Sequence, residues 1–583
     1  MTSHSRKNAT PVSGNIHYGV DERPPFDVTL FSAVQHLAAI APPGLVLPML
    51  VATAAGADRA TLNMVLSGSM LALGIATLLQ CGRWRTLGSG FLAPAIFTAA
   101  YLPSCLHAAA SGGMALVAGM MMFAGVCEFL LAFALGRLRP YLPTEIAGLA
   151  VTMIGIMLGL LGFRLMFGLP QSGAGPGLEP AMTLDSVFGL GALVGIFVVN
   201  IWGPRWLRIY AVLVALVVAW VLAALLGLID LAALREGMRQ GVIGWPGLPQ
   251  ALPRFDSSLA FEFGVTALAS SLRTLGDLTT CQKINDPNWQ RPDMGSLKRG
   301  LLADGIGNVI AGGLGTIGLS PFSGSIGLSV ATGVKARRVG LAVGFIFIVL
   351  AFCPAASALV GSIPMPVSGA ILLFSACFIL INGMQILLSR LLDNRKVLVV
   401  GLGVIAGLSR DLFPDFFASM RVLEPLAASP LAEALLVAML LNACFRLGTR
   451  MRAQLQFEPG ASAVAQVHEF CEAQGGAWAA RRDVMQRVTL ALGEFAETAA
   501  EVVAPNEQVT LELAFDEFHI DATLRYVGQG LAEAEVAPGA PPATLEALEL
   551  PDDISLRILT RMADRFTQGR DGRTQWLRLG FEH

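Results

Sequence analysis

The sequence predicts an all-α membrane protein that is followed by a small α+β cytoplasmic domain. Of its 583 residues, 54% are hydrophobic and only 14% are charged, whereas soluble domains carry about 25% charged residues. Between residues 28 and 445 the chain is a series of apolar stretches, many near the ~20 residues that a helix needs to cross a bilayer. Charged residues become frequent only after Arg446. These patterns favour a polytopic membrane protein over a water-soluble one.

The apolar stretches predict fourteen spans, which we arrange as a 7+7 inverted repeat. Three of them, 90–103, 300–313 and 321–334, are too short to cross a bilayer as full helices. The predicted spans are 28–52, 62–81, 90–103, 112–136, 143–162, 185–202, 207–229, 259–280, 300–313, 321–334, 339–360, 366–389, 396–409 and 427–445.

The distribution of Lys and Arg between the spans predicts the orientation. Cytoplasmic loops carry an excess of these residues. With both termini cytoplasmic, most Lys and Arg between the spans fall in cytoplasmic gaps. The opposite gaps then hold only Arg59, Arg164, Arg235, Arg239, Arg254, Arg410 and Arg421. The sequence therefore predicts a multi-pass protein of the inner (cell) membrane.

Two short segments occupy matching places, third and tenth in the chain, and both are rich in glycine and proline. Gly-Ser-Gly at 88–90 and Pro94 open the third span, and Ser-Pro-Phe-Ser-Gly-Ser-Ile-Gly at 320–327 opens the tenth. Paired interrupted segments in two halves are typical of inverted-repeat transporters, whose solute site lies near the middle of the bilayer. The free amides at each half-helix N-terminus can bind a polar or anionic solute.

At these motifs, residues 18–448 resemble the nucleobase–ascorbate transporter family (nucleobase:cation symporter-2), the xanthine/uracil permeases. The resemblance includes the Gln35-His36 pair of the first span. It also includes Leu-Gly-Ser-Gly at 87–90, Leu-Gly-Asp-Leu at 275–278, the ninth-span segment 300–307 and the tenth-span signature 320–337, which begins Ser-Pro-Phe322. It implies a core of spans 1–4 and 8–11, a gate of the remaining spans, and a homodimer.

Two motifs depart from the family pattern. Members usually carry a glutamate in the eighth span that holds the nucleobase, and its place here, counted from Leu-Gly-Asp, is Arg273. The tenth-span signature usually has Gln or Glu followed by Asn, and here these places are Gly324 and Ser325. Both usual side chains are replaced, so the resemblance implies transport without implying uracil or xanthine as the solute.

We therefore take Arg273, Gly324, Ser325, Phe322 and the Gln35-His36 pair as candidate solute-binding residues. An arginine within a span normally faces a cavity or a partner, and its planar fork suits a carboxylate or a urate-like oxyanion. The alternative is a structural ion pair with Asp277, which lies four residues further along the same helix face. His36 could instead hold helices together by hydrogen bonds.

Two intramembrane carboxylates complete the candidates. Asp277 and Asp304 are candidates for coupling to H⁺ or Na⁺, because such groups often relay protons or bind sodium. The alternative for both is a hydrogen bond to the backbone of a broken helix. We expect Glu128 and Glu145 to be interfacial. No cysteine pair has Cys-x-x-Cys spacing, so no metal and no cofactor are expected.

Beyond the spans, residues 1–25 form a polar cytoplasmic N-terminus, 26–450 the permease domain, 451–460 a linker and 461–583 a soluble domain. We expect helices at 461–475, 480–503 and 554–566, a hairpin of 508–515 and 517–526, a loop at 534–551 and a final strand at 574–581. This order resembles the histidine-kinase-like ATPase fold in its anti-sigma-factor form. The resemblance is degenerate, because Thr498 stands where that fold's asparagine follows Glu494. A regulatory or assembly role without catalysis is favoured over nucleotide binding.

Together these features predict a cation-coupled symporter of purine or pyrimidine nucleobases, or of a related anion such as urate, and not an enzyme. Its partners would be a small-molecule solute and membrane lipid, and no nucleic acid. Two alternatives remain: an anion exchanger of the sulfate-permease type, and a sensor that binds solute and signals through the C-terminal domain.

Overall fold

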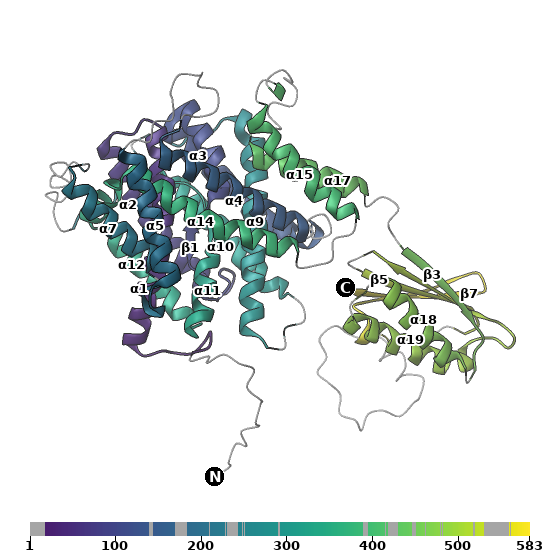
Figure 1. Ribbon diagram of the computed structural model, residues 1–583. Coiled ribbons are helices and arrows are strands. Elements are labelled where there is room, and N and C mark those ends of the chain that lie inside the picture. The colour runs from purple at the N-terminus through teal and green to yellow at the C-terminus, as the bar shows by residue number, and fades with distance from the viewer. Residues whose placement is uncertain are drawn as a thin grey trace, which may run out of the picture. The chain divides into compact units, whose positions relative to one another are not determined.

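The computed structural model describes residues 18–582, apart from 139–143, 170–183, 209, 228, 230–242, 248, 250, 288, 290–291, 389–393, 414–415, 418–428, 446–450, 461, 479, 481, 517–518, 530–558 and 560. The chain divides into two compact units, Met1–Ala443 and Cys444–His583. The first unit is a bundle of helices, and the second is a sheet with helices on one face (Figure 1).

The helices of the first unit follow the predicted spans in order. They are α1 (Phe26–Ala54), α2 (Arg59–Cys81), η1 (Ala99–Tyr101), α3 (Leu102–Leu138), α4 (Thr144–Phe167), α5 (Leu184–Trp202), α6 (Arg205–Arg208), α7 (Ala211–Leu225), η3 (Ser257–Leu259), α9 (Ala260–Asn285), α10 (Met294–Gly313), α11 (Ser323–Thr332), α12 (Arg337–Ala351), α13 (Pro354–Gly361), α14 (Met365–Leu387), α15 (Asn394–Leu412) and α17 (Pro430–Phe445).

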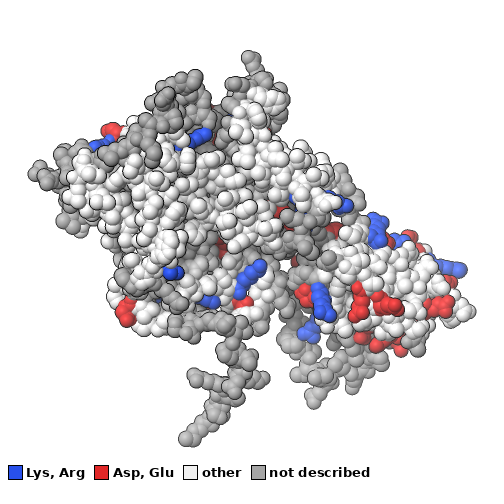
Figure 2. Space-filling model, in the orientation of Figure 1, with Lys and Arg blue, Asp and Glu red and all other residues white. Residues whose placement is uncertain are grey.

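Within the described residues, five of these segments are long and apolar enough to cross a membrane alone: α1, α2, η1 with α3, α4 and α14. Shorter apolar helices are Ser186–Trp202, Ala211–Leu225 and Pro430–Phe445, and α12 with α13 forms a bent pair. On the visible face of this unit, Lys, Arg, Asp and Glu are sparse (Figure 2). The chain is a multi-pass membrane protein, while the count of fourteen spans and the inverted repeat stay predictions.

Two predicted spans were wrong in length or continuity. The segment 300–313 is not a short span, because α10 begins at Met294 and has 20 residues, with the Asp293 side chain accepting a hydrogen bond from the amide of Gly295. The segment 339–360 is not one helix, because α12 and α13 meet at 89°. Pro354 opens α13, and a proline cannot donate the backbone hydrogen bond that would continue α12.

Glycines bring the main helix pairs of this unit into backbone contact. A Cβ atom on Gly125 of α3 would come within 2.8 Å of the backbone oxygen of Gly305 in α10. The same holds for Gly155 of α4, 2.6 Å from the backbone nitrogen of Leu380 in α14, and for Gly74 of α2, 2.7 Å from a backbone oxygen of α12. Small residues permit such close crossings, which membrane helices use because lipid supplies no hydrophobic drive between them.

Substituting Gly305 by alanine should therefore destabilise the membrane unit. The new methyl group would meet the backbone nitrogen of Phe129 at 2.7 Å, and overpacking of this kind costs about 1–3 kcal/mol. Thermal unfolding in detergent should show a lower midpoint. Gly313→Ala is the control on the same helix, because a Cβ there meets nothing within 4 Å. Equal midpoints for the two variants would contradict the proposed crossing.

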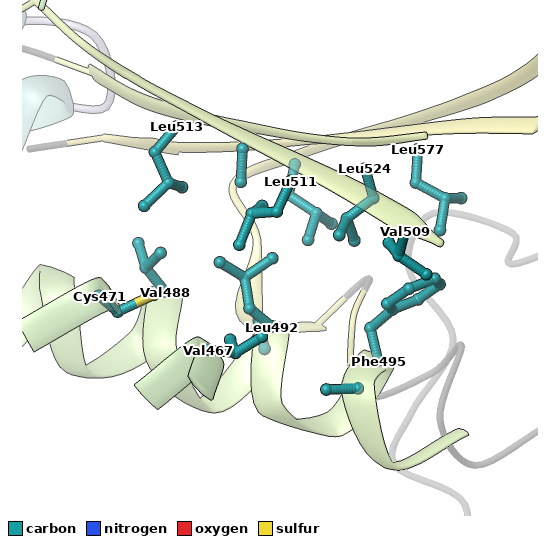
Figure 3. Packing of buried hydrophobic residues seen from close by; sticks show 14 of the residues in the cluster. Val467, Cys471, Val488, Leu492, Phe495, Val509, Leu511, Leu513, Leu524 and Leu577 are labelled. Atoms are coloured by element: carbon teal, nitrogen blue, oxygen red, sulfur yellow. The ribbon is translucent and has the colours of Figure 1, made fainter. Parts of the chain in front are cut away.

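The second unit contains a five-stranded antiparallel sheet in the order β3-β4-β5-β7-β6. Its strands are β3 (Met451–Phe457), β4 (Val509–Phe515), β5 (His519–Val527), β6 (Arg565–Asp571) and β7 (Thr574–Glu582), and α18 (Ala463–Ala477) and α19 (Arg482–Val502) cover one face. Alternate residues of β4 and β5 point to these helices, as the strand period of two requires. Leu511 and Leu524 thus pack toward Val488 and Leu492 (Figure 3).

The predicted helices 461–475 and 480–503 and the hairpin of 508–515 and 517–526 are confirmed by α18, α19, β4 and β5, and two other expectations were wrong. The linker 451–460 is not unstructured, because β3 pairs along its whole length with β4. β3 is an edge strand with most side chains exposed. Its sequence is therefore polar and resembles that of a linker. The predicted helix 554–566 ends before Arg565, where β6 begins, and 551–558 and the predicted loop 534–551 lie outside the described residues. The ATPase resemblance stays a prediction.

Cys471 tests this packing. Cys471 lies on the face of α18 that packs into the hydrophobic core. Burial of its thiol raises the pKa of that group to about 11. Because the thiolate is the reactive form, the native protein should resist alkylation of Cys471 at pH 8, and unfolding should restore the reaction. Peptide mapping by mass spectrometry measures this. Labelling of native Cys471 at the rate of a free thiol would contradict the packing.

Candidate functional site

The third and tenth spans are interrupted by two short strands that pair with each other. β1 (Ala95–Phe97) and β2 (Leu319–Pro321) are antiparallel, with Ile96 opposite Ser320. The predicted discontinuity of both spans is thus confirmed. Each strand is followed by a half-helix, η1 and the start of α3 after β1, and α11 after β2. The half-helices begin at opposite ends of a three-residue pair, about 10 Å apart along the strands.

Neighbouring groups hold the strand pair in place. The amide of Ala95 donates to Thr77 Oγ1 of α2 at 3.1 Å, and the amide of Phe322 donates to the carbonyl of Pro94 at 3.0 Å. On entry to β1, Gly88 and Gly90 have φ values of +85° and +76°. A Cβ at Gly88 would lie 2.1 Å from a backbone oxygen. The glycines of this segment are thus required by the turn into the strand.

Arg273 of α9 reaches the N-terminus of the first half-helix. Its side chain is 6% exposed, and one guanidinium nitrogen donates to Thr98 Oγ1 at 3.0 Å. Thr98 is the residue that caps η1. Arg273 Nε also lies 3.7 Å from Asp277 Oδ2. The expected ion pair with Asp277 is therefore present, and it is joined to the broken spans.

Asp277 reaches the N-terminus of the second half-helix. Its Oδ1 accepts a hydrogen bond from Ser323 Oγ of α11 at 2.6 Å. Through Arg273 and Asp277, the helix α9 therefore contacts the first turn of both half-helices. The chain Thr98–Arg273–Asp277–Ser323, which we call the α9 bridge, connects two places that are 225 residues apart in the sequence.

The other tenth-span candidates surround the start of α11. Phe322 is the residue before the helix, and its ring lies so close to Gly324 that a Cβ there would be 2.4 Å from it. Gly324 is exposed and Ser325 is fully buried. The hydroxyls of Ser325 and Ser320 have no hydrogen-bond partner within the described residues. Unpaired hydroxyls next to free helix amides are groups that a polar solute can satisfy.

The first-span candidates are two buried polar side chains of α1. Gln35 and His36 of α1 are 7% and 1% exposed, and His36 Nδ1 has no hydrogen-bond partner in the described part of the chain. No hydrogen bond between described residues joins either of them to Arg273, Asp277 or α11. Their role in binding stays a prediction.

Asp304 of α10 is 4% exposed and accepts a hydrogen bond from Thr274 Oγ1, next to Arg273 in α9. This contact places the second ion-coupling candidate beside the α9 bridge. Its partner is a side-chain hydroxyl rather than the backbone.

Sequence reasoning missed a second polar group between the half-helices. Glu128 of α3 is not interfacial but fully buried. It accepts hydrogen bonds from Tyr101 of η1 and from Asn308 of α10. Asn308 also pairs with the backbone of Leu319 in β2. The available signal was that Asn308 lies four residues after Asp304, on the same helix face. Glu145, by contrast, forms an ion pair with Lys396 at 3.0 Å.

The ion pair of the α9 bridge predicts non-additive stability. Removing one partner of a buried pair leaves an uncompensated charge and costs about 3–5 kcal/mol. Asp277→Asn and Arg273→Met should each lower the unfolding midpoint in detergent, and the double variant should lose much less than the sum of the two. A double-variant loss equal to that sum would show that the two side chains do not interact.

Comparison with known proteins agrees with this architecture. Residues 28–415 match the model of the xanthine/uracil permeases, described as "Permease family". The chain is 28% identical over 469 residues to xanthine permease XanP of Escherichia coli (strain K12), covering 75% of this chain and 97% of the relative. It is 27% identical over 449 residues to xanthine permease XanQ of the same organism, covering 73% of this chain and 92% of that one.

Among solved structures, the anion transporter murine Slc26a9 in the inward-facing state has a TM-score of 0.52 at 13% identity, and the match covers 82% of this chain and 85% of that one. This likeness concerns the fold alone. With the family match over most of the membrane unit, it follows that the chain belongs to the xanthine/uracil permease family.

Proposed function

We propose that the protein is a secondary active transporter that moves a nucleobase-type solute, or a related anion such as urate, in symport with H⁺ or Na⁺. The family membership and the printed names of XanP and XanQ support a solute of this class. Alternating access between a core and a gate would expose the site to each side of the membrane in turn.

The observation that carries the solute class is the α9 bridge. Each half-helix N-terminus contributes about half a positive charge. Arg273 adds one positive charge and Asp277 removes one. The groups that the bridge joins therefore sum to about +1, and this potential acts in a region of low dielectric constant. An anion, or a heterocycle that presents carbonyl oxygens to Arg273 and an N–H group to Asp277, fits this arrangement.

The replacement of the usual tenth-span side chain supports the same solute class. Because Gly324 has no side chain and the Phe322 ring lies against it, recognition at α11 falls to backbone amides and to Ser325. Backbone amides at a helix N-terminus bind carboxylates and other oxyanions without a dedicated side chain. Asp277 and Asp304 are the proposed ion-coupling residues, because Asp277 belongs to the bridge and Asp304 bonds to Thr274 beside it.

Ligand-dependent stabilisation tests the role of Arg273. Urate should raise the unfolding midpoint of the wild type, and the charge reversal Arg273→Glu should weaken urate binding at least tenfold, about 1.4 kcal/mol. Arg338→Glu is the control, because Arg338 is an exposed arginine outside the bridge. Stabilisation of Arg273→Glu by urate equal to that of wild type would reject Arg273 as a solute contact.

Flux in proteoliposomes separates the proposed transport from the alternatives. Labelled urate or xanthine should accumulate when a proton or sodium gradient is imposed. Exchange of sulfate or bicarbonate without such accumulation would instead indicate an anion exchanger, and urate binding without flux would indicate a sensor. We further propose a homodimer in the inner membrane with both termini cytoplasmic, which the Lys and Arg distribution supports.

A further inference from the structure

Glu128 is a buried carboxyl group that the proposed solute site does not use. It lies in α3, is fully buried, and forms no ion pair with a Lys or Arg among the described residues. Its Oε1 accepts from the hydroxyl of Tyr101 at 2.8 Å, and its Oε2 accepts from Asn308 Nδ2. A carboxylate in such a place is costly and is normally kept for a function.

The orientation of Asn308 is determined by the backbone of β2. Asn308 Oδ1 accepts from the amide of Leu319, and Asn308 Nδ2 donates to the carbonyl of Leu319 at 3.1 Å. If the side-chain amide of Asn308 were flipped, its Nδ2 donor would face the amide N–H of Leu319, and its Oδ1 acceptor would face the carbonyl of Leu319. Neither contact could be a hydrogen bond. The group that faces Glu128 must therefore be the donor Nδ2. It follows that Glu128 Oε2 can only accept, whether or not the carboxyl group carries a proton.

At Oε1 the partner is the hydroxyl of Tyr101, which does not restrict that oxygen to accepting. A phenol hydroxyl can either donate or accept. When Glu128 is ionised, Tyr101 donates to Oε1, and when Glu128 is protonated, Oε1–H can donate to the Tyr101 oxygen. The hydrogen-bond network thus accepts a proton at one defined oxygen, Oε1, without losing the bond to Asn308.

The residues around this carboxyl group connect it to the solute site. Tyr101 follows Thr98, the Arg273 partner, by three residues, and Asn308 lies one helical turn from Asp304. Among the described residues, the other titratable groups near Glu128 and Tyr101 are Asp304 of α10 and Cys127 of α3, and Arg273 and Asp277 lie near Asp304. The hydroxyl of Ser270 of α9 faces Glu128 and Tyr101. The first half-helix therefore contacts the network through Tyr101, and β2, the strand that leads into the second half-helix, contacts it through Leu319.

We infer that Glu128 is a further proton-binding residue of coupled transport, in addition to the proposed coupling residues Asp277 and Asp304: Oε1 takes a proton from water on one side of the membrane and releases it to water on the other. This inference rests on the proposed function. Protonation reverses the hydrogen bond to Tyr101 while Asn308 keeps β2 in place. Protonation of Glu128 therefore changes a hydrogen bond of the first half-helix, whose N-terminus belongs to the proposed solute site. Binding of the proton and binding of the solute are coupled through this half-helix.

The experiment uses the full-length protein in proteoliposomes with labelled urate. Glu128→Gln keeps the shape and mimics the protonated form, because its oxygen can accept from Asn308 and its NH₂ group can donate to Tyr101. It should bind urate within about threefold of wild type (0.7 kcal/mol by the relation of affinity to free energy). It should exchange urate across the membrane but lose accumulation driven by a pH gradient. Its urate affinity should no longer depend on pH.

Glu145→Gln serves as the matched control, since Glu145 is another buried glutamate but pairs with Lys396. It should keep gradient-driven accumulation. Tyr101→Phe is the second variant, which keeps Glu128 but removes its partner at Oε1. It should shift the pH dependence of urate binding without abolishing binding, and it keeps the inference testable should Glu128→Gln fail to fold.

Four outcomes separate the inference from the proposed function. Accumulation by Glu128→Gln equal to wild type, or an unchanged pH profile in Tyr101→Phe, would overturn the inference alone. Accumulation by wild type with a sodium gradient but not with a pH gradient would also overturn it and leave symport standing. Absence of any urate or xanthine uptake by wild type would reject the proposed function and the inference together.

Discussion

The architecture of the membrane unit depends on the pairing of two interrupted backbones. A chain that leaves the helix within a bilayer exposes amide and carbonyl groups that lipid cannot satisfy, at a cost of several kcal/mol for each. Here β1 and β2 satisfy one another, and Thr77 and Asn308 provide side-chain partners for the same segments. The two half-helix N-termini are consequently positioned by hydrogen bonds as well as by apolar packing.

The surrounding helices make this pairing possible by approaching closely. Gly125 and Gly305 let α3 and α10 cross at backbone distance, and only such a crossing brings Glu128 on α3 within reach of Asn308 on α10. The packing of apolar helices and the polar network at the centre are therefore coupled. A change in the distance between α3 and α10 would alter the hydrogen bond between Glu128 and Asn308, and with it the bonds from Asn308 to β2.

The α9 bridge joins both half-helices through a positively charged side chain. A glutamate in place of Arg273 would have brought negative charge to the half-helix N-termini. The guanidinium instead brings positive charge, which the adjacent Asp277 balances. Because both residues also bond to the half-helices, through Thr98 and Ser323, the bridge is structural, and the proposed solute contact uses the same guanidinium group. The two readings that the sequence left open for Arg273 are therefore compatible.

Hydropathy and glycine-proline motifs by themselves determined the membrane class, the order of the helices and the interruption of the third and tenth spans, because lipid imposes strong local requirements on composition. The i,i+4 spacing also predicted the pair of Arg273 with Asp277. Other features depended on long-range contact. The start of α10 at polar residues, β3 in the expected linker, the contact of Arg273 with Thr98 and the burial of Glu128 all result from partners far along the chain. A local pattern carries no information on which distant group will satisfy a buried donor or charge, so only the tertiary structure decided them.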